Sequence, residues 1–192
     1  MLTFDSDSHT YRHGDKVVPS VTQLLGRLHS FALVPADVLA AACARGTYVH
    51  ALCEFYDQQD LDDSSVGIYR GYLDAWGKFC ADHKAEWTGV EVQGYSKRYG
   101  YAGTLDRCGT LNGALWVIDL KTSQASHPVW NMQLAAYRQL LAETVDAKWA
   151  LARLGTVQLR PDGTYKLIEW SDPDAWPAFL SLITLTNWSN KS

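Results

Sequence analysis

The chain has 192 residues, of which 47% are hydrophobic and 20% are charged, and its formal net charge is −4. This composition is typical of a globular protein with its own hydrophobic core. A net negative charge argues against a protein that coats long stretches of duplex, because that binding comes from neutralising phosphates. Any contact with nucleic acid should therefore be local.

The segment MLTFDSDSHTYRHGD has neither the cationic nor the apolar part of a signal peptide, and no apolar run approaches the roughly 18 residues of a membrane span. We expect a cytoplasmic protein that makes no membrane contact. The scattered cysteines form no C-x-x-C pair, so neither a zinc site nor a disulfide framework is predicted. They are Cys43, Cys53, Cys80 and Cys108.

The N-terminal part, residues 1–86, should hold a hairpin and helices. The stretches TFDS and HTYRH predict the hairpin, and Ser20 is a suitable N-cap for a short helix. Apolar residues at helical spacing predict helices over residues 35–56 and 66–83. The first of these helices is expected to break near Arg45-Gly46.

The remaining residues, 87–192, are predicted to form a sheet-containing core within one domain that spans residues 1–192. Strands are expected at residues 89–95, 101–111 and 114–122. A helix should open at Pro128, followed by two strands around the turn RPDGT and a final helix from Asp172. Apolar residues occupy both faces of the central hairpin, which predicts an α/β fold with helices over a buried sheet.

Two aspartates face each other in that central hairpin. Asn112-Gly113 favours a two-residue type I′ turn, and the register that this turn sets places Asp106 opposite Asp119. Like charges at opposed positions destabilise a sheet, by about 4 kcal/mol at a separation of about 4 Å and a surface-like dielectric. The pair therefore needs a shared proton or a cation.

A divalent metal ion would satisfy both carboxylates. Oxygen ligands suit Mg²⁺ or Mn²⁺. Lys121 lies two residues after Asp119 and should point to the same face of the strand, where it could meet a phosphate or an attacking water. An isolated D-x-K motif would more often be a simple salt bridge, but the opposed Asp106 favours a site.

Four ordered motifs resemble the PD-(D/E)XK nuclease superfamily in its RecB-like branch. They are the histidine of RGTYVH, then GTLD, then IDLKTS, then QLAAY. The stretch VPSVTQLL also resembles the opening of phage and mitochondrial-genome-maintenance-type exonucleases within this branch. The resemblance implies a restriction-endonuclease-like core with a central mixed β-sheet flanked by helices and an N-terminal helical region.

The resemblance also implies the roles of individual residues. His50, Asp106 and Asp119 would hold the metal, with the backbone carbonyl of Leu120 as a further ligand. Because Mn²⁺ accepts an imidazole ligand more readily than Mg²⁺ does, a histidine ligand predicts a preference for manganese. Asp106, Asp119, Lys121, Gln133 and Tyr137 would form the catalytic group.

Other residues have two interpretations. Arg45, Thr122 and Ser123 could bind DNA phosphates, or they could be a solvated helix residue and residues of a turn. Glu54, one helical turn after His50, could join the site or face solvent. Glu91 is expected to be structural.

The predicted function is metal-dependent hydrolysis of DNA phosphodiesters by an exonuclease that acts on ends or single strands in recombination, repair or phage DNA processing. A single-strand annealing or binding protein is a possible partner. No iron-sulphur cluster is expected, because no cysteine follows Cys108. The alternatives are a structure-specific endonuclease and an inactive nuclease-fold subunit that binds DNA or protein.

Overall fold

A mixed sheet of five strands forms the centre of the molecule in the computed structural model, which describes residues 1–5, 8–28 and 35–189. The strands lie in the order in which they occur in the chain. Neighbouring strands are antiparallel except β6 and β7, which are parallel and are joined across one face by helix α4. Their bounds are β4 Glu86–Ser96, β5 Tyr101–Leu111, β6 Ala114–Lys121, β7 Arg153–Leu159 and β8 Tyr165–Trp170.

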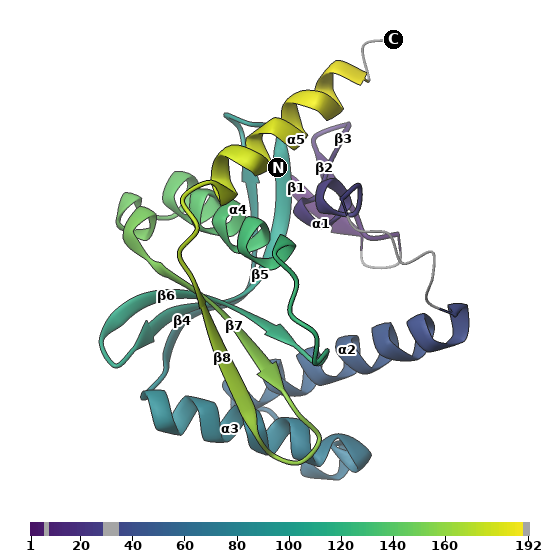
Figure 1. Cartoon of the computed structure of the whole chain (residues 1–192), viewed down its shortest axis with the longest axis vertical. Helices are drawn as coiled ribbons and strands as arrows, with labels where there is room; N and C mark the ends of the chain where they lie inside the picture. Colours follow the sequence, from purple (N-terminus) through teal and green to yellow (C-terminus); the bar gives the residue numbers. More distant parts are fainter. Residues whose placement is uncertain (6–7, 29–34, 190–192) are drawn as a thin grey trace.

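Helices cover both faces of this sheet (Figure 1). On one face α4 (Val129–Thr144) and α5 (Ala175–Ser189) pack together with the short α1 (Val21–Leu25) in one hydrophobic cluster. On the other face α2 (Ala36–Asp57) and α3 (Arg70–His83) contribute to a second cluster around Trp76. The predicted α/β fold, a mixed central sheet flanked by helices, is confirmed.

The hairpin of β5 and β6 has the predicted turn and register. Asn112 and Gly113 have φ angles of 49° and 78°, as a type I′ turn requires. Pairing runs from Leu111 opposite Ala114 to Arg107 opposite Ile118. The next position in this register is that of Asp106 and Asp119.

A second, three-stranded sheet lies beside β5. It consists of β1 (Leu2–Asp5), β2 (Thr10–His13) and β3 (Lys16–Val18). The predicted hairpin is the pair β1 and β2, whereas β3 is too short to show an alternating pattern in the sequence. The backbone N–H of Ala102 donates to the carbonyl of Pro19 at 2.9 Å, which fixes the end of this sheet against β5.

Several boundaries differ from the sequence prediction. Helix α2 is continuous through Gly46, since one glycine costs only about 1 kcal/mol relative to alanine in a packed helix. Helix α3 begins at Arg70, because two short 3₁₀ helices (Asp63–Ser65 and Gly67–Tyr69) come first. The last helix begins at Ala175, and a further 3₁₀ helix, Ala147–Leu151, follows α4.

The predicted N-cap of α1 is confirmed. The Ser20 side chain accepts the backbone N–H of Gln23, and the Gln23 side chain accepts that of Ser20, as in a capping box. None of the described helices combines the length and the apolar character needed to cross a membrane.

Candidate metal centre and its cavity

The strands β5 and β6 separate at the opposed aspartates. Backbone pairing stops at Arg107 and Ile118, and β6 continues as the partner of β7. Beyond this point the link from β6 to β5 is made by a side chain, because the Asp106 carboxylate accepts the backbone N–H of Leu120 at 2.7 Å. The hairpin therefore holds Asp106 through its side chain and directs this carboxylate towards β6.

His50 reaches the same point from α2. Its Nε2 lies 3.0 Å from the carbonyl oxygen of Leu120, and because a carbonyl only accepts, Nε2 is the donor. In the neutral ring Nδ1 then carries the lone pair, and it lies 3.6 Å from Oδ2 of Asp106. Histidines that bind metals commonly donate their other N–H to a carbonyl in this way. The carbonyl of Leu120, which we predicted as a ligand, thus orients His50 here.

Asp119 and Lys121 form an ion pair of 2.6 Å inside the protein. Asp119 is 1% exposed, and burial raises its pKa to about 6, with Lys121 opposing the shift and Asp106 adding to it. Burial lowers the pKa of Lys121, but the charges of Asp119 and Asp106 outweigh this effect, and its pKa lies above the ordinary value. Lys121 is therefore an ammonium ion, suited to orienting or neutralising an anion rather than to accepting a proton.

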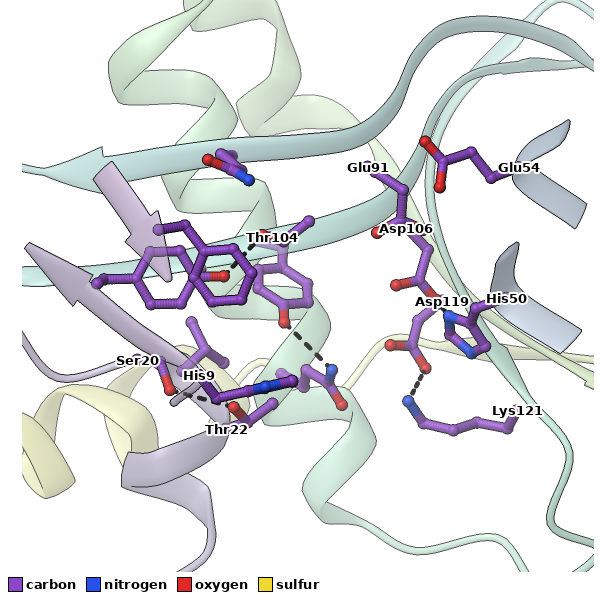
Figure 2. A pocket seen from close by; sticks show the side chains of 17 residues that line it. His9, Ser20, Thr22, His50, Glu54, Glu91, Thr104, Asp106, Asp119 and Lys121 are labelled. Atoms are coloured by element: carbon purple, nitrogen blue, oxygen red, sulfur yellow. Dashed lines mark hydrogen bonds and ion pairs between the residues drawn. The ribbon is translucent and has the colours of Figure 1, made fainter. Parts of the chain in front are cut away.

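Glu91, for which the sequence favours a structural role, also lies in this group. It lies opposite Asp106 on β4, between the pairs Val90–Arg107 and Val92–Leu105. One ligand atom each of His50, Glu91 and Asp106 falls within 4.8 Å of the others (Figure 2). Burial, reinforced by the charge of Asp106, raises the pKa of Glu91 to about 8.

The backbone of Glu91 has an unusual conformation. Its φ angle is 49°, a left-handed conformation that costs a residue other than glycine about 1–3 kcal/mol. Such strain is typical of functional sites. The sequence did not reveal the position of Glu91, because residues 97–100 between β4 and β5 carry no two-residue turn signal that would fix the register.

A buried arginine holds Glu91 in place. Nε of Arg107 contacts Oδ2 of Asp57 at 2.6 Å, and its Nη1 contacts Oε1 of Glu91 at 3.1 Å. Nη1 also donates to the backbone carbonyl of Asp106 at 2.7 Å. Trp76 donates to the other oxygen of Asp57 at 2.9 Å. This network joins the end of α2 to β4 and β5, the strands that carry Glu91 and Asp106, and no motif in the sequence predicts it.

These residues fit a divalent cation. The group combines one imidazole nitrogen with carboxylate oxygens, the donor set that Mn²⁺ accepts and Mg²⁺ tolerates in part. Oδ1 of Asp119 is buried and accepts no hydrogen bond from the described residues, so it remains available as a further ligand. A cation would also favour the ionised forms of Glu91 and Asp119, whose pKa values are raised by burial.

Gln133 and Tyr137 lie together on the inner side of α4, as predicted. Nε2 of Gln133 donates to the Tyr137 hydroxyl at 3.3 Å, and both side chains are buried. A Cβ added at Gly103 would lie 2.8 Å from Cε1 of Tyr137. The glycine of the GTLD motif therefore provides the space for the tyrosine ring beside the acidic group.

These side chains line a cavity of about 530 Å³. His50, Asp106, Asp119, Lys121 and Glu91 line one part of it, together with Gln133, Tyr137 and Glu54. Glu54 therefore faces the site, although Oε1 of its carboxylate accepts a hydrogen bond from Gln58 at 3.1 Å. The other part is lined by the N-terminal sheet and α1 (Figure 2).

The three predicted DNA-binding residues lie outside the cavity lining. The Ser123 hydroxyl donates to the carbonyl of Ala125 at 3.1 Å, which favours the turn-forming role. Thr122 follows β6 directly, and its hydroxyl lies 3.9 Å from a Cβ built at Gly46 of α2. Arg45 precedes Gly46 in α2. It is half-buried, and its Nε has no acceptor in the described part of the chain.

No family model matches the chain, and no curated protein matches it either. Among solved structures it is similar to a "putative exonuclease" from Eubacterium rectale, with a TM-score of 0.46, 12% identity and coverage of 73% of this chain. This chain spans 64% of the length of that protein. It is also similar to SSO0001, with a TM-score of 0.38, 20% identity and coverage of 77% and 71% of the two chains. Both TM-scores lie below 0.5, so function has to be inferred from the residues of this chain.

Proposed function

We propose that this chain is a divalent-metal-dependent deoxyribonuclease of the PD-(D/E)XK type. The observation that carries the proposal is the juxtaposition of the His50, Glu91 and Asp106 ligand atoms, within 4.8 Å of one another, with the ion pair of Asp119 and Lys121. His50, Asp106, Asp119 and Lys121 follow the order of the motifs that resemble the superfamily, whereas Glu91 lies outside those motifs.

Nδ1 of His50 and the carboxylates of Glu91 and Asp106 would hold the ion, with Oδ1 of Asp119 as a further ligand. When bound, the ion would lower the pKa of a coordinated water and offset negative charge on the phosphate. Lys121, which is paired with Asp119 at 2.6 Å, would orient the attacking water or stabilise the developing negative charge.

The same proposal includes an exonuclease acting on DNA ends or single strands. A cavity of about 530 Å³ is in the range that takes a ligand the size of a small organic molecule, roughly 300–1,000 Å³, rather than a duplex. Substrate would therefore enter as one strand or a frayed end. A role in recombination, repair or phage DNA processing, with a single-strand annealing or binding protein as partner, would follow from that preference.

Cleavage of linear single strands, linear duplex and closed circles in Mg²⁺ and in Mn²⁺ tests this proposal. The parent should degrade linear DNA from its ends in the presence of either ion, and it should leave closed circles intact. Rapid cutting of closed circles would indicate an endonuclease instead. DNA binding without cleavage of any of these substrates would identify the inactive binding subunit.

A further inference from the structure

The cavity has two chemically different halves. One half holds the charged side chains of the candidate metal centre. Among the described residues that line it, the other half has no acidic or basic side chain apart from His9, and it presents aromatic rings and hydroxyl groups (Figure 2). We call this second half the aromatic wall, and it consists of Phe4, His9, Tyr11, Ser20, Thr22 and Thr104.

The rings of the aromatic wall pack on one another. Phe4 and Tyr11 have ring centroids 4.5 Å apart with a tilt of 30°, and His9 meets Phe4 edge-on at 5.6 Å. Both rings line the cavity, but Phe4 is half-buried, whereas Tyr11 is 6% exposed and belongs to a small hydrophobic cluster against which Phe4 packs. A partly exposed ring that is held by packing against a second ring is a suitable surface for a flat ligand.

The aromatic wall is fixed relative to the acidic group. The Tyr11 hydroxyl shares a hydrogen bond of 2.6 Å with the hydroxyl of Thr104. Thr104 precedes Asp106 by two residues on β5, so both side chains point to the same side of the strand. The same strand thus carries an anchor of the aromatic wall and a ligand of the candidate metal centre.

We propose that the aromatic wall is a stacking subsite for the nucleobase of the nucleotide whose phosphate lies at the metal centre. This inference rests on the proposed function. A nucleotide joins a flat aromatic base to an anionic phosphate, and the two halves of the cavity match those two chemistries. The Ser20 hydroxyl caps α1 and shares a hydrogen bond of 3.1 Å with the hydroxyl of Thr22, so the exposed Thr22 is the residue that would meet the edge of the base.

Stacking on Phe4 would be tolerant of sequence, because every base has a π face. It would also require an unpaired nucleotide, since a base within a duplex is stacked on its neighbours. The subsite would therefore explain, in this chain's own residues, a preference for single strands or frayed ends.

Binding of single-stranded oligonucleotides to an Asp119→Asn variant in Mg²⁺ tests the subsite without cleavage. One oligonucleotide carries 2-aminopurine at its terminal position, and a matched one is abasic there. Binding should quench the 2-aminopurine fluorescence. The affinity of the abasic oligonucleotide is measured by its competition with the fluorescent one, and it should be roughly 5- to 150-fold weaker, which is the loss expected when one base–aromatic stack is removed. This comparison needs no change in the aromatic wall.

Adding Phe4→Leu keeps an apolar side chain in the N-terminal sheet but removes the aromatic face. This variant should bind the two oligonucleotides with nearly equal affinity. Adding Trp188→Ala, which removes a 73% exposed aromatic ring outside the cavity, should leave the discrimination intact.

Equal affinity of Asp119→Asn for intact and abasic strands, or unchanged discrimination after Phe4→Leu, would overturn the subsite. That result would leave the nuclease proposal standing if the parent cleaves DNA in Mg²⁺ or Mn²⁺. Base-dependent binding in a parent that cleaves nothing would have the opposite meaning, because the subsite would stand and the nuclease proposal would fail.

Discussion

Arg107 and Asp57 form an ion pair of 2.6 Å in which 0% and 3% of the two side chains are exposed. The pair links the C-terminal end of α2 to β5, and through Arg107 it reaches Glu91 on β4. Burial raises the pKa of Asp57 even though Arg107 opposes the shift, which shows that desolvation of the carboxylate is costly. The pair is therefore better understood as a device that positions Glu91 than as a source of stability.

Removing one partner of this pair should be strongly destabilising. Asp57→Ala leaves the Arg107 guanidinium buried without its closest countercharge, so the free energy of unfolding in urea should fall by about 3–5 kcal/mol. Glu169→Ala is the matched control, because it breaks the exposed pair with Arg153 and should cost below about 1 kcal/mol. Equal losses in the two variants would show that the buried pair has no special role.

Gly103→Ala should disturb the packing of Tyr137. The new Cβ would lie 2.8 Å from Cε1 of Tyr137 and 3.2 Å from Cγ2 of Val21, and Tyr137 is 3% exposed and has little room to move. Overpacking of this kind costs about 1–3 kcal/mol, which thermal unfolding would detect as a lower Tm.

Gly46→Ala provides the control for that substitution. Within the part of the chain that the structure describes, a Cβ at Gly46 has only Oγ1 of Thr122 within 4 Å, at 3.9 Å, and the residue lies within α2. Alanine should therefore raise stability by up to about 1 kcal/mol. Destabilisation at Gly46 equal to that at Gly103 would contradict the placement of α2 and Tyr137.

Thiol labelling at pH 8 tests the fold independently of function. Cys43 is exposed, whereas Cys53 and Cys108 are buried. Burial raises the pKa of Cys80 to about 12, with the charge of Asp57 adding to the shift, so its reactive thiolate forms only in strongly alkaline solution. Native protein should show one fast-reacting thiol, and Cys43→Ser should show none, while unfolding should expose all of them. Fast reaction in Cys43→Ser would contradict this packing.

Metal binding should raise thermal stability through the acidic group. A ligand at 100 times its Kd adds about 2.7 kcal/mol to the folded state, so the parent should gain Tm in Mn²⁺. Asp106→Asn should gain little, and Asp119→Asn should gain less than the parent. Without metal, Asp119→Asn should be as stable as the parent or more so, because burial disfavours the charged carboxylate and Lys121, unlike Arg107, is partly exposed and keeps Asp106 as a countercharge.

Asp74→Asn, on the exposed side of α3, is the control for these metal titrations and should respond to Mn²⁺ like the parent. If Asp119→Asn were unfolded without metal, the carboxylate would be a structural partner of Lys121 and not part of a metal centre.

The sequence was sufficient for features that depend on local patterns. The Asn112-Gly113 turn fixed the register of β5 and β6, and with it the positions of Asp106 and Asp119. Helical spacing placed His50, Gln133 and Tyr137 on the helices where they lie. In each case the relevant partners are close in sequence or share one turn.

Features that depend on distant contacts were not predicted. Glu91 meets Asp106 through a register of β4 and β5 that no turn motif specifies, and its left-handed backbone breaks the alternation of the strand. The partnership of Arg107 with Asp57 joins residues far apart in sequence. The aromatic wall also depends on how the N-terminal sheet packs on β5, which the sequence of either element alone does not determine.

If the group around Asp106 is a metal-dependent nuclease centre, the rate of cleavage of an end-labelled single-stranded oligonucleotide should depend on Mn²⁺ as the ion is titrated. The parent should show no cleavage without the ion and saturable cleavage with it, and folded Asp106→Asn and Lys121→Ala should each lose at least roughly 100-fold in rate, as removal of an electrostatic catalytic group typically does. Cleavage at the parent's rate by Asp106→Asn, or no cleavage by the folded parent in Mn²⁺ or Mg²⁺, would contradict the account.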